Sequence, residues 1–200
     1  MLPVSGDSDI LQLDQLLIAA KAGDRGAYTG ILRARQAMVY SIARTFLRNG
    51  THAEDIAQDV FLELFRNIQT IESGAHLVSW LRQVTGRKCI DQSRRVWFRR
   101  LVSLEDDGGG GYNDPRSAPS SKDPLLTERV DAAMGKLPEK TRMMMILRYQ
   151  EELEPGEIAD VMQVPVGTVK STIHRGLEQM RRRLAGVIQK GKPWISLKTI

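Results

Sequence analysis

The chain has 200 residues and a net charge of +5, with an isoelectric point near 9.5. Its composition, rich in Leu, Ala, Arg and Glu, gives no sign of a β-sandwich or barrel, and its length allows one domain or two small ones. The single cysteine, Cys89, excludes a disulfide framework, and no stretch is long and apolar enough to be a secretion signal or a membrane span. We therefore expect a cytoplasmic protein without membrane insertion, whose positive charge suits a polyanionic partner.

The first third of the chain predicts two helices after a disordered N-terminus at residues 1–8. Apolar side chains recur at helical spacing from Asp9, and Gly23 should close this first helix. Asp24 should cap a longer second helix, which Asn49-Gly50 should stop. Both elements have one apolar face, so they should pack against neighbouring helices.

A third and a fourth helix complete a predicted first domain over residues 9–98. Thr51 should cap the third helix, with Glu54 three residues on as in a capping box. Its inward-facing side chains are predicted to be Ile56, Val60, Leu64 and Phe65. After a loop over residues 69–76, the fourth helix should bury Leu77, Trp80, Leu81, Val84 and Ile90. This helix also carries a run of basic residues.

A change of composition separates this domain from the rest of the chain. Four consecutive glycines and a Pro/Ser-rich tract predict a flexible linker over residues 99–123, because such a sequence cannot bury enough apolar surface to order itself. A second domain is predicted over residues 124–186, followed by a tail over residues 187–200. Its first two helices, around residues 125–134 and from Leu137 onward, should brace the rest of that domain, with three consecutive methionines filling the core.

Residues 154–184 have the pattern of a helix-turn-helix. Pro155 suits the first turn of a short helix, the segment Val164 to Gly167 breaks it, and Thr168 should cap the next helix. An apolar stripe then runs along the second helix at Val169, Ile173, Leu177, Met180 and Leu184. We expect the other face, near the helix start, to meet the major groove of DNA through Lys170, Ser171, Thr172, His174 and Arg175.

Five segments in register make the chain resemble an extracytoplasmic function (ECF) sigma factor of bacterial RNA polymerase. They are AKAGDRGAY, AEDIAQDVFLELF, VSWLRQV, LPEKTRMMMILRY and EIADVMQVPVGTVKSTIHRGLEQMRRRL. The resemblance implies an all-α fold of two small helical domains joined by a flexible linker, sigma region 2 over residues 9–98 and sigma region 4 over 124–186. It also implies a protein without catalysis or cofactor that binds core RNA polymerase, opens promoter DNA and is controlled by an anti-sigma factor.

The same resemblance assigns three sets of site residues. Core polymerase would bind Asp55, Gln58 and Asp59, which share one face of the third helix. The single-stranded minus-ten element would meet candidate base contacts at Asn67, Thr70, Ser73 and His76, and backbone contacts at Arg82, Arg87, Lys88, Arg94 and Arg95. The duplex minus-thirty-five element would meet Thr168, Lys170, Ser171, Thr172, His174 and Arg175.

Three other interpretations of the residues can be weighed. An autonomous helix-turn-helix regulator would bind duplex DNA as a symmetric dimer, but it would not need the acidic third helix or the basic fourth one. A nucleic-acid enzyme would need convergent carboxylates or a phosphate-binding loop, and the sequence has neither. A metal site at His52, Asp55 and Asp59 would have a helical stripe of ligands but no second set elsewhere; we therefore predict no metal.

Overall fold

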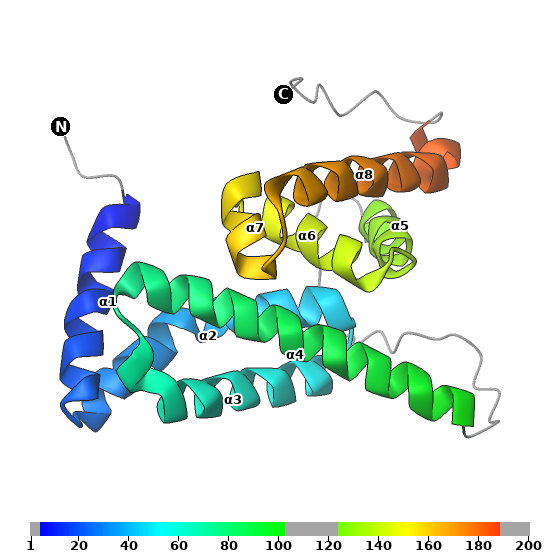
Figure 1. Cartoon of the computed structure of the whole chain (residues 1–200). Coiled ribbons are helices and arrows are strands. Elements are labelled where there is room, and N and C mark those ends of the chain that lie inside the picture. The colour runs from blue at the N-terminus through cyan, green and yellow to red at the C-terminus, as the bar shows by residue number, and fades with distance from the viewer. Residues whose placement is uncertain (1–4, 103–123, 189–200) are drawn as a thin grey trace.

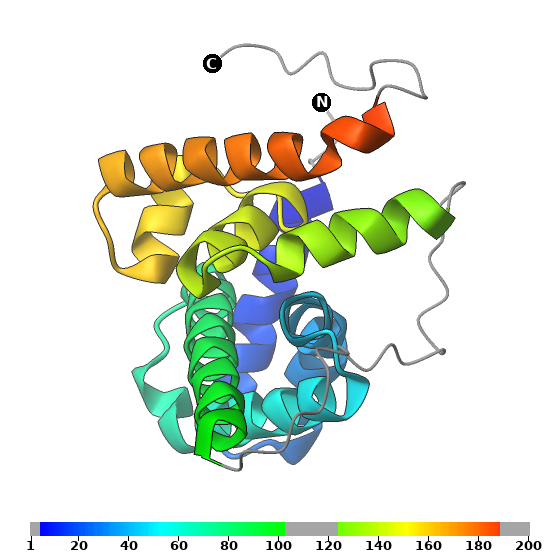
Figure 2. The ribbon, with the colours of Figure 1, turned by 90° about the vertical axis from the view of Figure 1, so that its right-hand side faces the viewer.

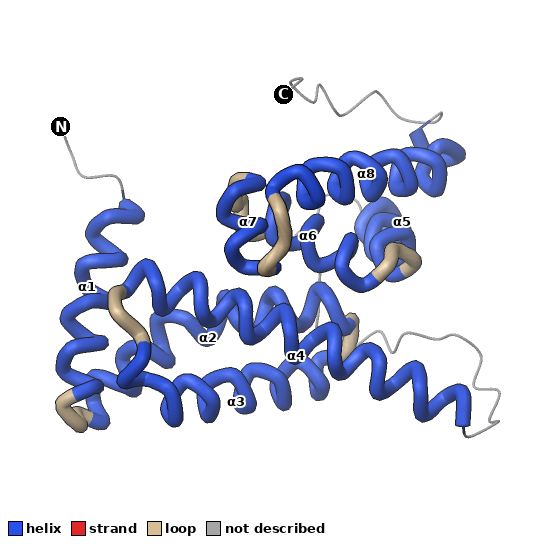
Figure 3. Tube along the Cα trace, viewed as in Figure 1, coloured by secondary structure: helices blue, strands red, loops and turns tan. Residues whose placement is uncertain are grey.

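The computed structural model describes residues 5–102 and 124–188, and all regular structure in these ranges is helical (Figures 1 and 3). The first group is α1 (Ser5–Lys21), α2 (Arg25–Leu47), α3 (Gly50–Asn67), a 3-10 turn η1 (Ile68–Thr70) and α4 (Gly74–Val102). The second is α5 (Pro124–Gly135), α6 (Glu139–Tyr149), α7 (Pro155–Met162) and α8 (Val166–Ile188). The predicted all-α class with two helical domains is confirmed.

Several helices extend beyond the predicted domain limits. Helix α1 begins at Ser5, so residues 5–8 are helical although the sequence predicted disorder there. Helix α4 continues to Val102, which moves residues 99–102 out of the predicted linker, because no glycine or proline interrupts the chain between residues 87 and 102. The remainder of the predicted linker, residues 103–123, and most of the predicted tail lie outside the described residues.

The boundary between α1 and α2 agrees with the sequence. Gly23 has a φ of +96°, a left-handed conformation that glycine adopts without steric cost. The Asp24 carboxylate accepts hydrogen bonds from the backbone N–H groups of Gly26 and Ala27 at 2.7 and 3.1 Å. Asp24 is therefore the N-cap of α2, as predicted.

The boundary between α2 and α3 differs from the prediction. Helix α2 ends when Arg48 takes a left-handed conformation, and the Asn49 side chain accepts a hydrogen bond from the His52 N–H at 2.9 Å. Asn49 thus starts α3 rather than stopping α2, and Thr51, the predicted cap, lies inside the first turn. Asparagine ranks above threonine as an N-cap, which explains the earlier start.

The first domain packs α2, α3 and α4 together, with α1 lying across them (Figure 1). Helix α1 approaches the start of α4 so closely that a Cβ at Gly74 would lie 2.7 Å from the carbonyl oxygen of Ile10. The Gly74 N–H donates to Asp14 Oδ1 at 2.5 Å. This contact fixes the loop before α4 against α1. The core includes Leu13, Ile31, Ile42, Phe46, Leu64, Leu77 and Leu81.

In the second domain, α5, α6 and α7 pack against α8. Met143, Met144 and Met145 are all buried, which confirms that the methionine run fills the core. Tyr149, at the end of α6, is half exposed rather than part of that core.

The two domains lie against each other along a seam formed by α6 and α7 on one side and α2 and α4 on the other (Figures 1 and 2). Buried side chains of both domains belong to one hydrophobic cluster. The Met143 side chain lies in van der Waals range of the position a Cβ would take at Gly86 of α4. The seam therefore has an apolar core of its own.

Candidate polymerase and nucleic-acid interfaces

The helix-turn-helix of the second domain is formed by α7 and α8. A capping box starts α7, with the Glu154 N–H donating to Glu157 Oε2 at 2.8 Å and Pro155 in the first turn as predicted. Gln163 ends α7 in a left-handed conformation. The predicted Thr168 cap of α8 is wrong: the Thr168 N–H donates to the Pro165 carbonyl at 2.9 Å, so the helix has already begun at Val166.

One face of α8 is buried and the other is open near its start. Val169 and Ile173 are buried, while Thr168, Lys170, Ser171, His174 and Arg175 are exposed. Thr172, which the sequence placed on the open face, is only 9% exposed. It lies three residues after Val169 and is small enough to enter the buried stripe. This burial removes Thr172 from the surface that α8 offers to a partner.

Local contacts orient two side chains on this open face. The Arg175 Nε donates to the Ser171 carbonyl at 3.3 Å, and His174 Nε2 lies 3.5 Å from Glu178 Oε1. Four exposed groups, Lys170, Ser171, His174 and Arg175, thus share one side of the helix. Their donors and positive charge match the phosphates and base edges of a major groove.

The outer face of α3 combines polar and apolar groups. Asp55, Gln58 and Asp59 are all exposed, in the arrangement expected from their spacing. The stripe continues along the helix with Leu62 and Phe65, which are 55% and 64% exposed. The sequence prediction that Phe65 packs inward is therefore wrong.

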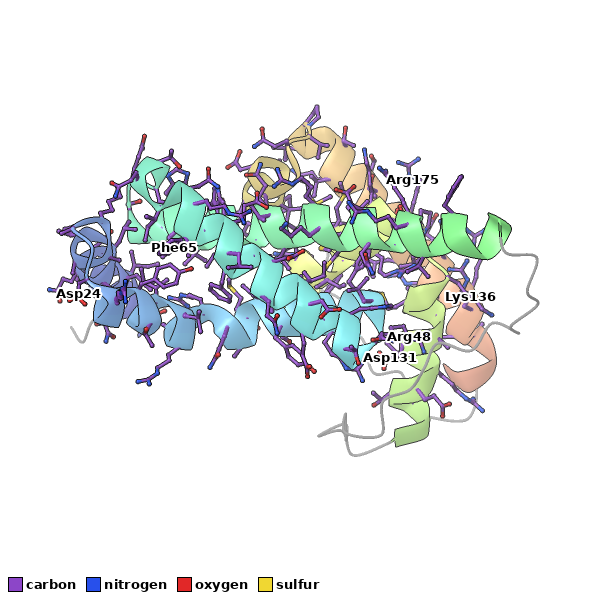
Figure 4. The ribbon with its side chains drawn as sticks, turned by 90° about the horizontal axis from the view of Figure 1, so that it is seen from below. Asp24, Arg48, Phe65, Asp131, Lys136 and Arg175 are labelled. Atoms are coloured by element: carbon purple, nitrogen blue, oxygen red, sulfur yellow. The ribbon has the colours of Figure 1, made fainter. Side chains whose placement is uncertain are left out.

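A groove of about 810 Å³ runs beside this face, between α2 and α3, and is lined mainly by nonpolar side chains. Phe61, rather than Phe65, turns into the core, while the Phe65 ring stands edge-on to the Tyr28 ring at 5.5 Å. Figure 4 shows Phe65 toward the Asp24 end of the first domain, away from Arg48. The sequence prediction missed Leu62 and Phe65, although their positions four and seven residues after Gln58 were a signal.

The predicted minus-ten loop is shorter than expected, because η1 and the start of α4 leave only residues 71–73 irregular. Ser73 Oγ accepts from the His76 N–H at 3.1 Å, and His76 Nδ1 accepts from the Glu72 N–H at 3.1 Å. Asn67 donates to the Glu63 carbonyl, and Thr70 donates to the Asn67 carbonyl, each at 2.8 Å. Ser73 and His76 thus shape the loop through local hydrogen bonds, while Asn67 and Thr70 bond to backbone carbonyls of α3.

The basic side chains of α4 point in different directions. Arg87 and Lys88 both pair with Glu63 of α3, with Lys88 Nζ 2.9 Å from Glu63 Oε2. Arg82 and Arg94 instead pair with carboxylates of the second domain, and Arg95 is exposed. The predicted basic minus-ten residues therefore do not form one surface. Two pair with α3, two pair with the second domain, and one is exposed to solvent.

The pairing with Glu63 predicts an acid-dependent loss of stability. Burial alone would raise the pKa of the Glu63 carboxyl, but Lys88 and Arg87 outweigh it and hold the pKa below its usual 4.5. A lowered pKa in the folded state stabilises the protein above the unfolded pKa, and this contribution is lost as the pH falls through the folded value. We expect wild type to lose more unfolding free energy than Glu63→Gln between neutral pH and about pH 3 in urea titrations. Equal losses would contradict the pairing.

Within the described residues, the remaining titratable groups include a buried cysteine and no cluster of metal ligands. Burial raises the pKa of Cys89 to about 12, so its thiol stays protonated and unreactive. Across residues 5–102 and 124–188, no three His, Cys, Asp or Glu side chains gather as metal ligands. In the same ranges no helix is long and apolar enough to cross a membrane.

The fold defines an all-helical protein of two packed domains, the second of which contains a helix-turn-helix, and comparison with known proteins gives its family. Sequence models of Sigma-70 region 2 and Sigma-70, region 4 match residues 31–99 and 127–180. The chain is 31% identical to the ECF RNA polymerase sigma factor SigW of Bacillus subtilis, over 82% of this chain and 92% of that protein. It is 32% identical to SigE of Mycolicibacterium smegmatis, over 82% of this chain and 65% of that protein. The chain belongs to the ECF sigma factor family.

Solved structures share the fold. CnrH, solved with the cytosolic domain of CnrY, aligns with a TM-score of 0.66 at 21% identity, over 88% of this chain and 98% of that chain. RpoE of Bartonella quintana, solved with the anti-sigma factor NepR, aligns with a TM-score of 0.65 at 18% identity, over 79% of this chain and 96% of that chain. As a sigma factor, the protein acts in transcription initiation by RNA polymerase.

Proposed function

We propose that the protein directs core RNA polymerase to promoters with three surfaces: α3 for polymerase, the η1–α4 segment for the minus-ten strand and the start of α8 for the minus-thirty-five duplex. The observation that carries this proposal is the open face of α8, where four exposed polar side chains lie opposite a buried stripe. This work requires binding and no covalent chemistry. It takes place in the bacterial cytoplasm, where polymerase and chromosome are.

On α3, we propose that Asp55, Gln58 and Asp59 accept hydrogen bonds from basic groups of a polymerase helix. Leu62 and Phe65, exposed on the same stripe, and the groove beside them would take that helix's apolar side chains. An interface that combines a buried aromatic anchor with charged contacts at its edge has the usual anatomy of a strong protein interface.

For promoter DNA, we propose that Lys170, Ser171, His174 and Arg175 contact the minus-thirty-five duplex, with Thr168 near the DNA backbone. The minus-ten strand would take backbone contacts from Arg82, Arg87, Lys88, Arg94 and Arg95 and base contacts from the η1–α4 loop. In the free protein, Ser73 and His76 hold that loop together, while Asn67 and Thr70 each donate to a backbone carbonyl of α3. Thr172 is buried, so we do not propose that it contacts DNA.

Replacing Arg175 with alanine tests the duplex contact. If Arg175 forms a bidentate contact to a base, Arg175→Ala should weaken binding to the preferred minus-thirty-five sequence by about 1–3 kcal/mol and relax selectivity at one position. Arg182→Ala is the matched control, since Arg182 is exposed further along α8. Binding is measured by fluorescence anisotropy. Equal losses of affinity for all DNA sequences would show that Arg175 contacts a phosphate rather than a base.

We also propose control by an anti-sigma factor. Support comes from the similarly folded RpoE of Bartonella quintana, which was solved with the anti-sigma factor NepR. The alternative, an autonomous dimeric helix-turn-helix regulator, does not account for the exposed Leu62–Phe65 stripe or the acidic groups beside it. It predicts that the protein alone binds palindromic duplex DNA as a dimer, which a gel-shift experiment distinguishes.

A further inference from the structure

An aromatic ring from each of two helices lines the groove between α2 and α3. Tyr28 comes from α2 and Phe65 from α3. The centroids of the two rings are 5.5 Å apart and their planes meet at 83°, so the rings are in edge-to-face contact. Phe65 is largely exposed, whereas Tyr28 is partly buried. The more buried ring thus supports the more exposed one.

The Tyr28 side chain is fixed to α3 through its hydroxyl group. Its Oη donates a hydrogen bond to the carbonyl oxygen of Phe61 at 2.6 Å. In an α-helix, the carbonyl of one residue also accepts the N–H of the residue four positions later, so this bond reaches the helical turn that carries Phe65. Burial raises the pKa of the Tyr28 phenol above its usual 10.0, which keeps the donor proton in place at neutral pH. The ring is therefore held at both ends, by α2 and by α3.

Phe65 has no such anchor in the core. Phe61 takes the inward position on this side of α3, and Phe65 stands outside it at 64% exposure. An exposed side chain can populate several rotamers, and confining it to one on binding costs free energy. A ring that is already confined in the free protein avoids part of that cost. Support from the Tyr28 ring therefore affects the affinity for any partner that binds Phe65.

We propose that Tyr28 is a positioning residue for polymerase binding. Its ring holds the Phe65 ring in one orientation beside the groove, and the polymerase helix meets Phe65 in that orientation. Tyr28 acts through Phe65, and its own hydroxyl stays bonded to the Phe61 carbonyl in the complex. This inference rests on the proposed polymerase-binding role of α3.

The orientation of Phe65 can be observed in the free protein by fluorine NMR. The chain has four phenylalanines, so incorporation of 4-fluorophenylalanine gives four signals. The Phe65 signal is the one that disappears in Phe65→Leu. We expect Tyr28→Leu to move this signal most of the way toward its position in the urea-unfolded protein, because the ring loses its neighbour.

Tyr40→Leu is the matched control for this measurement. Tyr40 is also a partly buried tyrosine of α2, but it does not line the groove. The same chemical change at this position should therefore leave the Phe65 signal where it is in wild type. Circular dichroism establishes that each variant is folded.

A double-mutant cycle measures the effect on polymerase binding, with labelled sigma factor titrated with core enzyme. Tyr28→Leu should weaken binding about threefold to tenfold, which corresponds to the cost of immobilising one side chain. In the Phe65→Ala background the same change should have no further effect, because the ring that Tyr28 positions is gone. Tyr28→Phe, which keeps the ring and loses the hydroxyl, should fall between wild type and Tyr28→Leu. Tyr40→Leu should bind as wild type does.

Three results would overturn this proposal. An unmoved Phe65 signal in Tyr28→Leu would mean that Tyr28 does not hold the ring. Equal affinity losses in the presence and absence of Phe65 would mean that Tyr28 contacts polymerase itself. Wild-type affinity of Tyr28→Leu, despite a moved signal, would mean that the orientation of Phe65 does not matter. The NMR measurement uses no polymerase, and the affinity of Phe65→Ala alone for core enzyme tests the proposed function separately.

Discussion

Replacing Asp55, Gln58 and Asp59 together with alanine is expected to abolish binding to core RNA polymerase, with an affinity loss of about a hundredfold or more. All three side chains lie on the outer face of α3, so the helix should keep its fold and its circular dichroism spectrum. The loss is expected because a polymerase helix docked in the adjacent groove would bring its basic groups to a face without acceptors.

The control for this variant removes the same negative charge elsewhere. Glu128→Ala with Glu152→Ala eliminates two exposed carboxylates of the second domain and should leave polymerase affinity within about twofold, since distant surface charges contribute little. Binding is measured with labelled sigma factor titrated with core enzyme. Unchanged affinity of the triple variant for core enzyme would mean that α3 is not the polymerase-binding helix.

Replacing Phe46 with alanine should have the largest effect on stability. Its side chain is fully buried in α2, and its ring is covered by the Arg142 guanidinium at the seam. Truncation leaves a cavity and removes the aromatic face from a partly buried cation, so we expect a loss of about 3–5 kcal/mol. Because a domain's total stability is only about 5–15 kcal/mol, urea unfolding should move to much lower concentrations.

Phe65→Ala is the matched control for Phe46→Ala and tests the polymerase surface as well. Phe65 is 64% exposed and has an edge-on contact with Tyr28, so its removal should cost only about 1 kcal/mol of stability. The same variant should weaken polymerase binding about tenfold or more, because an exposed aromatic beside a groove is a typical anchor. Equal destabilisation by both variants would contradict the burial that distinguishes them.

The sequence predicted those features that short-range patterns encode. Helical spacing identified the buried stripe of α8 because Val169, Ile173 and Met180 are large and apolar. It failed at the edges of such stripes. Thr172 is small enough to be buried despite its hydroxyl, and Phe65 stays exposed because Phe61 takes the inward position. At the helix starts, Asn49 and Pro165 accept hydrogen bonds from the N–H groups of His52 and Thr168, so both helices begin before the predicted caps Thr51 and Thr168.

The seam between the domains could not be predicted, because nothing local encodes it. Arg82 and Glu151 are 69 positions apart, and each looks like an ordinary surface charge in its own segment. The packing of the two domains along the seam, including Met143 against Gly86 of α4, brings them together. The resemblance to sigma factors predicted a DNA role for Arg82 but not its pairing with the second domain.

Run-off transcription decides whether the protein directs initiation. Bacterial core RNA polymerase is supplied with a pool of promoter fragments, with and without the full-length protein, and the transcript ends are sequenced. We expect new, defined start sites that depend on the protein and disappear with the Asp55, Gln58 and Asp59 triple variant. Absence of new start sites, together with binding of palindromic duplex DNA by a dimer of the protein alone, would contradict the sigma-factor role and favour the autonomous regulator.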